Sequence, residues 1–493
     1  MLTILTTTES SQKIRDAIAS VERLDELVSI TEDADTIKDL KILVVNSDTI
    51  TIPLDWYDLE PPYVFPNTPL NRENLLALIF YKLGNQQKAF EYISEEYPIY
   101  HHLLIATHLQ FGYEISSEMV EFCYNTSRHN NAIISFYGVI ENPKSKEELK
   151  KEFSEALSKA ENDEVKVFTA KHYLNLLLDS GELKEAKQVA EQQLSVAISE
   201  DAKNAMNTQL AGILMAQLQV PYTPEKLNEI HEMQLTSIAH FESKELNVQA
   251  GMLLVDAAEI ANFKEDFIAS KELINRAILY FKKEDIPEFL GEAGFKKAIL
   301  LYTWSKNGSP QYYKAAINAF QDVLKVFKRD THPQKFADVH HNLALIYSEI
   351  PVVAEEKPMW TAFCASSFKE VLAFYTADRY PYENAMASHN YATALMHFPP
   401  AKIHDNLKKA SGLFNDALTI RTAEEYPFER ALTLINQLEL GWLTHNEDAA
   451  EELKKYEEMK SKAEEVKNLV EDANLISQAD EHLKELEKVK SLI

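Results

Sequence analysis

Apolar residues recur every three or four positions through most of this chain, which predicts amphipathic helices from about residue 71 onward. In the second half the pattern also repeats on a larger scale. Four copies of one phrase begin at Pro287, Pro333, Pro381 and Pro427, which are 46, 48 and 46 residues apart. A fixed period of this size with helical spacing inside it predicts a stack of helical repeats, because one such unit cannot bury its apolar face alone.

Small, polar and aromatic residues keep fixed places within the repeated phrase. The three clear copies carry Ala four residues after the proline and Asn nine residues after it; these asparagines are Asn342, Asn390 and Asn436. The fainter first copy has Gly291 and Lys296 in those places. Thirteen residues before the prolines stand Ile274, Phe320, Phe368 and Phe414. We expect the three phenylalanines to be buried between successive repeats.

The first 70 residues follow a different pattern. LTILTTT reads as a strand, Ser10 to about Ile30 as an amphipathic helix, and KILVVN and DTITIP as two further strands. A small α/β cap is therefore expected over residues 1–55, with strands only before about residue 55. Residues 56–70 contain Pro61, Pro62, Pro66 and Pro69, which predicts an extended linker.

Two segments resemble tetratricopeptide repeats: NRENLLALIFYKLGNQQKAFEYI from Asn71 and AKHYLNLLLDSGELKEAKQVAEQQL from Ala170. Gly84 and Gly181 stand where such repeats turn from one helix to the next. The resemblance covers roughly residues 70–446, and the longer units of the second half are similar to the long-helix arrays of bacterial signalling and defence proteins. It implies a mainly α fold, a right-handed α-solenoid of stacked helix pairs.

The helical part divides into three regions. Residues 71–265 should form an irregular tetratricopeptide-like region and residues 266–446 the regular long repeats. Residues 447–493 are highly charged and carry an irregular apolar stripe. They are expected to be capping helices that close the last repeat, with a coiled-coil dimer as the alternative.

Composition restricts the partners. The 493 residues carry a formal net charge of −27, which opposes binding to nucleic acid and to anionic membranes and favours basic partners. Cys123 and Cys364 are far apart, so no disulfide framework is expected. The sequence has no run of 18 apolar residues and no basic leader segment, so we expect a cytoplasmic protein without a membrane span.

Catalytic and cofactor motifs are missing from the sequence. It contains no GxGxxG, P-loop, GxSxG or HExxH motif. His101, His102 and His108 have no acidic partner at helical spacing, so we interpret them as packing or surface residues rather than metal ligands. We interpret the His340–His341 pair in the same way. We therefore predict no catalytic residue, no metal site and no cofactor.

The resemblance makes the repeated asparagines candidates for peptide binding. In tetratricopeptide proteins an Asn on the concave face often holds the backbone of a bound peptide, since its amide both donates and accepts. It thereby implies a groove site at Asn342, Asn390 and Asn436, with His341, His389 and Lys296 beside them. The alternative is that each Asn braces its own repeat.

The leading hypothesis is a non-enzymatic scaffold or adaptor that binds a protein or peptide partner in a concave groove. A sensor that binds a small molecule or a signalling peptide, and an enzyme with an active site in the groove, are the rival hypotheses. The sequence determines neither the partner nor the oligomeric state.

Overall fold

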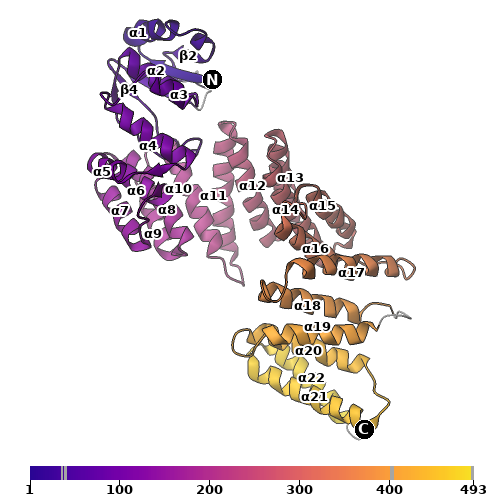
Figure 1. The fold of residues 1–493 in the computed structure, drawn as a ribbon. Helices are drawn as coiled ribbons and strands as arrows, with labels where there is room; N and C mark the ends of the chain where they lie inside the picture. The colour runs from indigo at the N-terminus through magenta and orange to yellow at the C-terminus, as the bar shows by residue number, and fades with distance from the viewer. Residues whose placement is uncertain (35–36, 38–40, 400–404, 490–493) are drawn as a thin grey trace. The chain divides into compact units, whose positions relative to one another are not determined.

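The computed structural model describes residues 1–34, 37, 41–399 and 405–489, and it divides into two compact units. Unit 1 is Met1–Glu265 and unit 2 is Asp266–Ile493. Helices account for 70% of the residues that the structure describes. The predicted mainly α fold of stacked helix pairs is confirmed, because each unit is a stack of consecutive helix pairs and a small sheet begins unit 1 (Figure 1).

The N-terminal cap is a mixed five-stranded sheet with the order β2-β1-β3-β4-β5. Its strands are β1 (Leu2–Thr6), β2 (Val28–Thr31), β3 (Ile42–Asn46), β4 (Thr49–Thr51) and β5 (Thr68–Pro69). The central strand β1 pairs in parallel with β2 and β3, whereas β3–β4 and β4–β5 are antiparallel. Helix α1 (Thr8–Ala19) connects β1 to β2 and buries Ile14 and Ile18.

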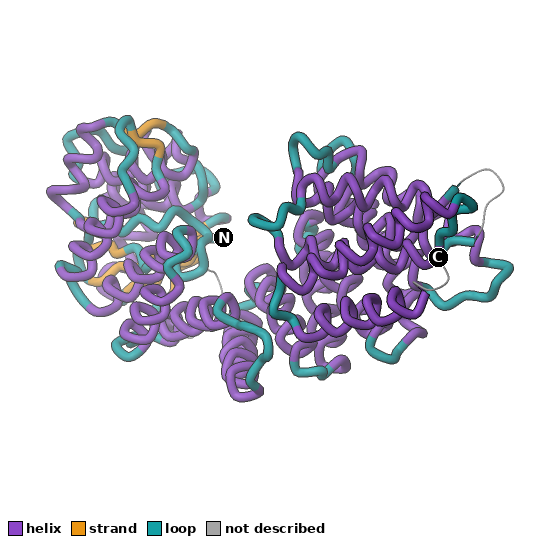
Figure 2. Tube along the Cα trace, turned by 90° about the horizontal axis from the view of Figure 1, so that it is seen from below, coloured by secondary structure: helices purple, strands orange, loops and turns teal. Residues whose placement is uncertain are grey.

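Two predictions for this region are wrong. The helix expected to reach Ile30 ends at Ala19, because the β-branched run Val28–Thr31 forms strand β2 beside β1 instead. Strands were expected only before residue 55, but β5 closes the sheet and two short strands, β6 (Glu114–Ile115) and β7 (Val139–Ile140), pair later in unit 1. Figure 2 shows the strands in orange, and among the described residues all of them belong to unit 1.

Helical hairpins follow the sheet in unit 1. Tight turns join them: Gly84 and Gly181 have φ values of 83° and 72°, a left-handed conformation in which glycine carries no steric penalty. The helices are α2 (Arg72–Lys82), α3 (Gln86–Phe90), α4 (Ile99–Phe111), α5 (Ser117–Thr126), α6 (Arg128–Tyr137), α7 (Lys146–Ser158), α8 (Asp163–Asp179), α9 (Leu183–Leu194), α10 (Glu200–Ala216), α11 (Pro224–Ser243) and α12 (Asn247–Phe263).

Unit 2 contains the long repeats. Its helices are α13 (Phe267–Lys283), α14 (Pro287–Lys306), α15 (Tyr313–Val326), α16 (Pro333–Glu349), α17 (Lys357–Phe374), α18 (Pro381–Met396), α19 (Asn406–Ile420), α20 (Pro427–Leu443), α21 (Ala449–Leu469) and α22 (Ala473–Val489). α14 pairs with α15, α16 with α17, α18 with α19 and α20 with α21. Each repeated proline is the first residue of its helix, where its fixed φ suits the helix and no hydrogen-bond donor is lost.

The fixed positions of the repeated phrase form the core of unit 2. Phe320, Phe368 and Phe414 are fully buried, which confirms the prediction for them. The fainter copy has Gly291 in place of Ala because a Cβ there would lie 2.8 Å from the Phe327 ring. α21 and α22 pack on α20 through a separate apolar cluster that includes Tyr456 and Val466.

Candidate functional site

The predicted site residues lie on the helices that open each repeat of unit 2, namely α14, α16, α18 and α20. We call these four helices the first helices. The first-helix face is the line of residues that crosses them through positions 296, 342, 390 and 436. All six predicted residues are buried or half-buried. Lys296 lies on α14, and the Asn342 Nδ2 donates to the backbone oxygen of Asp338 one turn earlier in α16, at 2.9 Å.

The other predicted residues meet in pairs that join neighbouring repeats. Asn390 Nδ2 on α18 lies 2.9 Å from His341 Nε2 on α16. Asn436 Nδ2 on α20 lies 3.3 Å from His389 Nε2 on α18 and also donates to Thr393 Oγ1 at 2.8 Å. We call these two contacts the His–Asn rungs. They connect three consecutive first helices through polar groups.

Both rung histidines are neutral. Burial lowers the pKa of His341 to about 4, and burial together with the positive charge of Arg421 lowers that of His389 to about 4. An amide nitrogen can only donate, so each Nε2 is the acceptor in its rung and the ring proton is on Nδ1. In His389 this Nδ1–H points to Thr433 Oγ1 on α20, at 3.2 Å.

Unit 1 contains a filled groove that the sequence did not predict. Residues 53–69, which we call the linker segment, run along helices α2 to α12. Asn130 on α6 makes a two-sided contact with this segment: its Oδ1 accepts from the Val64 N–H at 2.9 Å, and its Nδ2 donates to the Val64 carbonyl at 2.8 Å. A buried side-chain amide thus recognises extended backbone in this protein, as the resemblance implied for the other unit.

Further polar side chains hold the linker segment by its main chain. His129 Nε2 lies 2.9 Å from the Pro62 oxygen, Lys171 Nζ donates to the Trp56 oxygen at 3.0 Å, and Gln249 Nε2 donates to the Tyr57 oxygen at 3.1 Å. A carbonyl oxygen can only accept, so His129 carries its proton on Nε2, whereas the rung histidines carry theirs on Nδ1.

Apolar anchors from the segment enter the core between these contacts. Trp56 packs edge-on against Phe168 at 5.1 Å between ring centres, and Phe65 packs against Tyr81 at 5.4 Å. Tyr63 is buried and its hydroxyl lies 2.9 Å from His102 Nδ1. The segment is therefore bound as an extended peptide would be, with main-chain hydrogen bonds and side-chain pockets.

Opposite charges also join the segment to the groove. Lys82 Nζ lies 2.7 Å from Glu60, and both side chains are largely buried. Lys171 Nζ lies 2.7 Å from Asp58. The linker segment is acidic, and lysines from α2 and α8 neutralise it.

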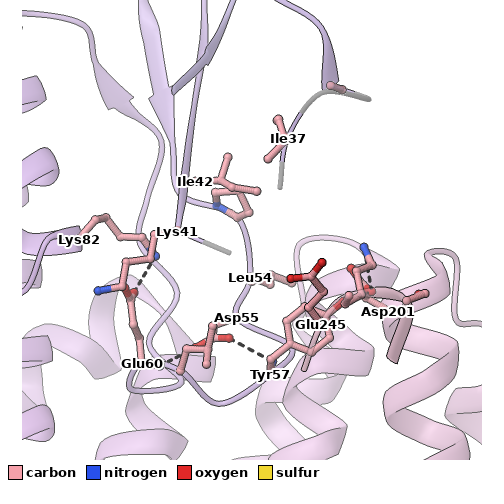
Figure 3. A pocket seen from close by; sticks show the side chains of 15 residues that line it. Ile37, Lys41, Ile42, Leu54, Asp55, Tyr57, Glu60, Lys82, Asp201 and Glu245 are labelled. Carbon is pink, nitrogen blue, oxygen red and sulfur yellow. Dashed lines mark hydrogen bonds and ion pairs between the residues drawn. The ribbon is translucent and has the colours of Figure 1, made fainter. Parts of the chain in front are cut away.

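A polar pocket of about 480 Å³ lies where the segment enters the groove (Figure 3). Tyr57 donates a short hydrogen bond to Asp201, which also lies 2.9 Å from His240 Nε2. Asp55 accepts from the backbone N–H groups of Tyr57 and Glu60, and burial raises its pKa. Asp201 therefore joins Tyr57 to His240, and Asp55 holds the backbone of the segment, so these contacts fix the start of the linker segment.

One sequence signal connects the two units. The pattern His-Asn-X-Ala occurs at 129–132, 341–344 and 389–392, and the alanine is fully buried in each copy. In two copies the histidine Nδ1 contacts a threonine two helices further along: His129 on α6 lies 2.9 Å from Thr169 Oγ1 on α8, and His389 on α18 lies 3.2 Å from Thr433 Oγ1 on α20. Only the copies at 341 and 389 were chosen from the sequence, because the copy at 129 lies outside the proline-based period.

Two further observations concern metal binding and membrane spans. Across residues 1–34, 37, 41–399 and 405–489, no group of three His, Cys, Asp or Glu side chains is arranged to hold a metal ion. Every described helix is too short or too polar to cross a membrane.

Comparisons with known proteins give only distant structural similarity. No protein-family model matches the chain, and no curated protein matches it. Among solved structures, the chain is similar to Naa15/Naa10 bound to HypK-THB (13% identity, TM-score 0.37, 86% of this chain), of which it spans 65%. It is also similar to the P58(IPK) TPR domain (12%, TM-score 0.20, covering 79% of this chain and 98% of that one) and to a circular tandem repeat protein (12%, TM-score 0.19, 85% and 88%). These scores are low, so the description of the fold rests on the chain's own helix packing.

Proposed function

We propose that this protein is a non-enzymatic scaffold or adaptor of the long-repeat tetratricopeptide-like type, and that its first-helix face in unit 2 binds an extended segment of a protein partner. The binding residues would be Asn342, Asn390 and Asn436, with His341, His389 and Lys296 beside them. The proposal concerns unit 2 because the corresponding groove of unit 1 already holds the linker segment.

The paired contact of Asn130 with the Val64 backbone carries this proposal. It is an Asn of the His-Asn-X-Ala pattern that binds extended main chain, and the same four-residue pattern recurs at 341–344 and 389–392. This contact does not depend on the side chain of the bound residue, since Asn130 hydrogen-bonds only to the backbone N–H and C=O.

The His–Asn rungs satisfy the polar groups of the proposed site when no peptide is bound. The amide of Asn390 and the imidazole of His341 satisfy each other at 2.9 Å, so neither polar group is left buried without a partner. A peptide that arrives would take over both groups: Asn390 would turn to its backbone, and His341 would move its proton to Nε2 and donate to a carbonyl, as His129 does. The exchange replaces one set of hydrogen bonds by another, so net affinity would come from apolar anchors.

The polar groups of the proposed site also favour binding over catalysis. Apart from Lys296 they are amides and imidazoles of low pKa, which are poor bases at neutral pH.

A peptide-display selection tests the proposal directly. Random twelve-residue peptides are selected on the full chain, and the affinity of the enriched peptides is measured for the wild type and for Asn342→Ala with Asn390→Ala. Each lost hydrogen bond is worth about 0.5–1.5 kcal/mol, so we expect roughly tenfold weaker binding by the double variant. Asn318→Ala, an exposed position on the second helix α15, is the matched control and should bind as the wild type does.

Melting temperatures are measured on the same preparations. A double variant that melts lower yet binds with unchanged affinity would show that the asparagines only brace the repeats, and the proposed site would be wrong. Failure to enrich any peptide on the full chain would contradict the proposed function itself.

A further inference from the structure

A second cavity of unit 1, of about 530 Å³, lies at the C-terminal end of the linker segment. Its walls come from residues 64–69 of that segment, from the first turns of α2 and α4, and from the junction of α5 with α6. Apolar and aromatic side chains form part of the lining, among them Phe65, Tyr97 and Ile99. A cavity of this size with a mixed lining is typical of small-molecule sites.

A buried polar atom of this lining has no hydrogen-bond partner. Asn74 on α2 is only 3% exposed, and its Nδ2 donates to the Pro69 carbonyl at 3.0 Å. Within the part of the chain that the structure describes, no donor reaches the Asn74 Oδ1. A buried acceptor without a donor is unfavourable and rare in folded proteins, so this oxygen points to a missing ligand group.

The comparison with Asn130 shows what the amide of Asn74 lacks. Asn130 satisfies both ends of its amide on one residue of the linker segment, the N–H and the carbonyl of Val64. Asn74 makes the carbonyl half of this contact, but its partner Pro69 has no N–H to donate. The linker segment therefore provides an acceptor for the Asn74 Nδ2 and leaves the Oδ1 for a donor from another molecule.

The charges around the cavity favour a neutral ligand. Helices α2, α4 and α6 begin beside it, after Asn71, Pro98 and Ser127, and the positive ends of three helix dipoles oppose a cation. Among the described lining residues the one ordinarily charged side chain is Glu161, which is exposed and opposes an anion. Burial lowers the pKa of His102 to about 4, so this lining histidine is neutral.

We propose that this cavity binds a small neutral aromatic compound whose amide N–H donates to the Asn74 Oδ1. The hydrogen bond satisfies the buried oxygen and fixes one edge of the ligand. The rings of Phe65 and Tyr97, together with Ile99, cover its flat faces. The site belongs to unit 1 and is independent of the peptide site proposed for unit 2.

Pairs of compounds that differ in the donor test this site on the full chain. Benzamide, nicotinamide and uracil are each compared with the counterpart in which every amide N–H is methylated, and dissociation constants are measured by ligand-observed NMR. We expect at least one parent compound to bind about tenfold more tightly than its methylated counterpart, because the parent alone can donate to a buried acceptor.

Asn74→Ala removes the acceptor and should make the two members of each pair bind with similar dissociation constants. Asn125→Ala, at an exposed position of α5 outside the lining, is the matched control and should keep the tenfold ratio. Because the ratio is measured on one preparation, a general loss of stability in Asn74→Ala does not imitate this result. Thr126→Trp places a large ring at an exposed lining position and should abolish the binding of both members.

Three outcomes overturn the inference. A tenfold ratio that persists in Asn74→Ala would show that the ligand donates to another group. Unchanged binding by Thr126→Trp would place the compounds outside this cavity, and this variant decides the matter if Asn74→Ala does not fold. Binding of none of the parent compounds to the wild type would contradict the proposed ligand class.

Discussion

The two units use the same residues in two ways. In unit 1, His129 and Asn130 both turn to the linker segment and bind its backbone at Pro62 and Val64. In unit 2, His341 and His389 turn instead to the asparagines of the next repeat. The difference is whether extended chain lies against these helices. It shows that a buried histidine and asparagine can hydrogen-bond either to an extended segment or to the neighbouring repeat.

The largest expected effect tests whether the linker segment is part of the core of unit 1. Phe168→Ala and Phe368→Ala should each cost about 3–5 kcal/mol in the free energy of unfolding, because both rings are almost fully buried. Phe168 contacts Trp56 and His129, so its loss should also speed hydrogen exchange in the linker segment, whereas Phe368→Ala should not. Denaturant unfolding and hydrogen exchange measure the two effects.

Phe363→Ala is the control on the same helix as Phe368. Its ring is 46% exposed, so the cost should be about 1 kcal/mol or less. Wild-type stability of Phe368→Ala would contradict the packing described for unit 2, and equal linker exchange in both core variants would contradict the role given to Phe168.

A second comparison sets Asn130 against Asn342. Asn130→Ala removes two hydrogen bonds from the Val64 backbone and should cost about 2–3 kcal/mol, with faster exchange over residues 62–66. Asn342→Ala removes one bond to its own helix and should cost about 1 kcal/mol or less, since alanine favours the helix. Equal costs in urea unfolding would mean that the two asparagines do not differ in role as described.

The sequence predicted unit 2 better than unit 1 for a physical reason. In unit 2 the three clear copies of the phrase have similar neighbours, so Pro, Ala and Phe recur every 46 to 48 residues and the buried Phe368 could be placed without a structure. In unit 1 the groove is made by residues far apart in the chain, such as Lys171 and Asp58, and no local pattern encodes their meeting. The prolines predicted an extended linker but could not predict the surface to which it binds.

The candidate site shows the same limit. The resemblance selected Asn342, Asn390 and Asn436 from their recurrence, and their use as peptide contacts stays a prediction. The sequence could not predict the hydrogen bond between Asn390 and His341, because it depends on how closely α16 and α18 approach each other. The pattern His-Asn-X-Ala at 129–132 was present in the sequence, and a search for it rather than for the proline period would have found Asn130.

The rungs predict a pH dependence that belongs to unit 2. The pKa of His341 is about 4 in the folded protein and about 6.5 when unfolded, so the unfolded chain takes up the proton first. The stability associated with this histidine is fully present above about pH 6.5 and is lost as the pH falls toward 4. At pH 5 the loss should be about 2 kcal/mol.

The variant His341→Gln isolates this contribution, because glutamine can accept from Asn390 but does not titrate. The difference in unfolding free energy between wild type and variant, measured from pH 7 to pH 4.5, should shift in favour of the variant as the pH falls. A constant difference over that range would show that protonation of His341 does not oppose folding.

The smallest effect concerns a feature that the two units share, the turns between helices. Glu245 in unit 1 and Asp285 in unit 2 have φ values of 59° and 54°, where Gly84 and Gly181 stand elsewhere. The hydrogen bonds of the turns match: Leu246 N donates to the Phe241 oxygen at 2.9 Å, Ile286 N to the Phe281 oxygen at 3.1 Å, and Asn85 N to the Phe80 oxygen at 2.9 Å. Glu245 and Glu265 replace the glycine that marks this turn at Gly84 and Gly181, so the sequence showed no clean repeat over residues 200–265.

Glycine should relieve the left-handed strain at these positions, so Glu245→Gly and Asp285→Gly should each stabilise the protein by about 0.5–1 kcal/mol, and by the same amount in both units. Gly181→Ala is the reverse control and should destabilise by about 1 kcal/mol. Thermal unfolding of the three variants measures this. Equal gains in stability would mean that the helix turns of the two units are alike and that the units differ only in what their His–Asn pairs contact. A gain in one unit alone would mean that their helix turns differ as well.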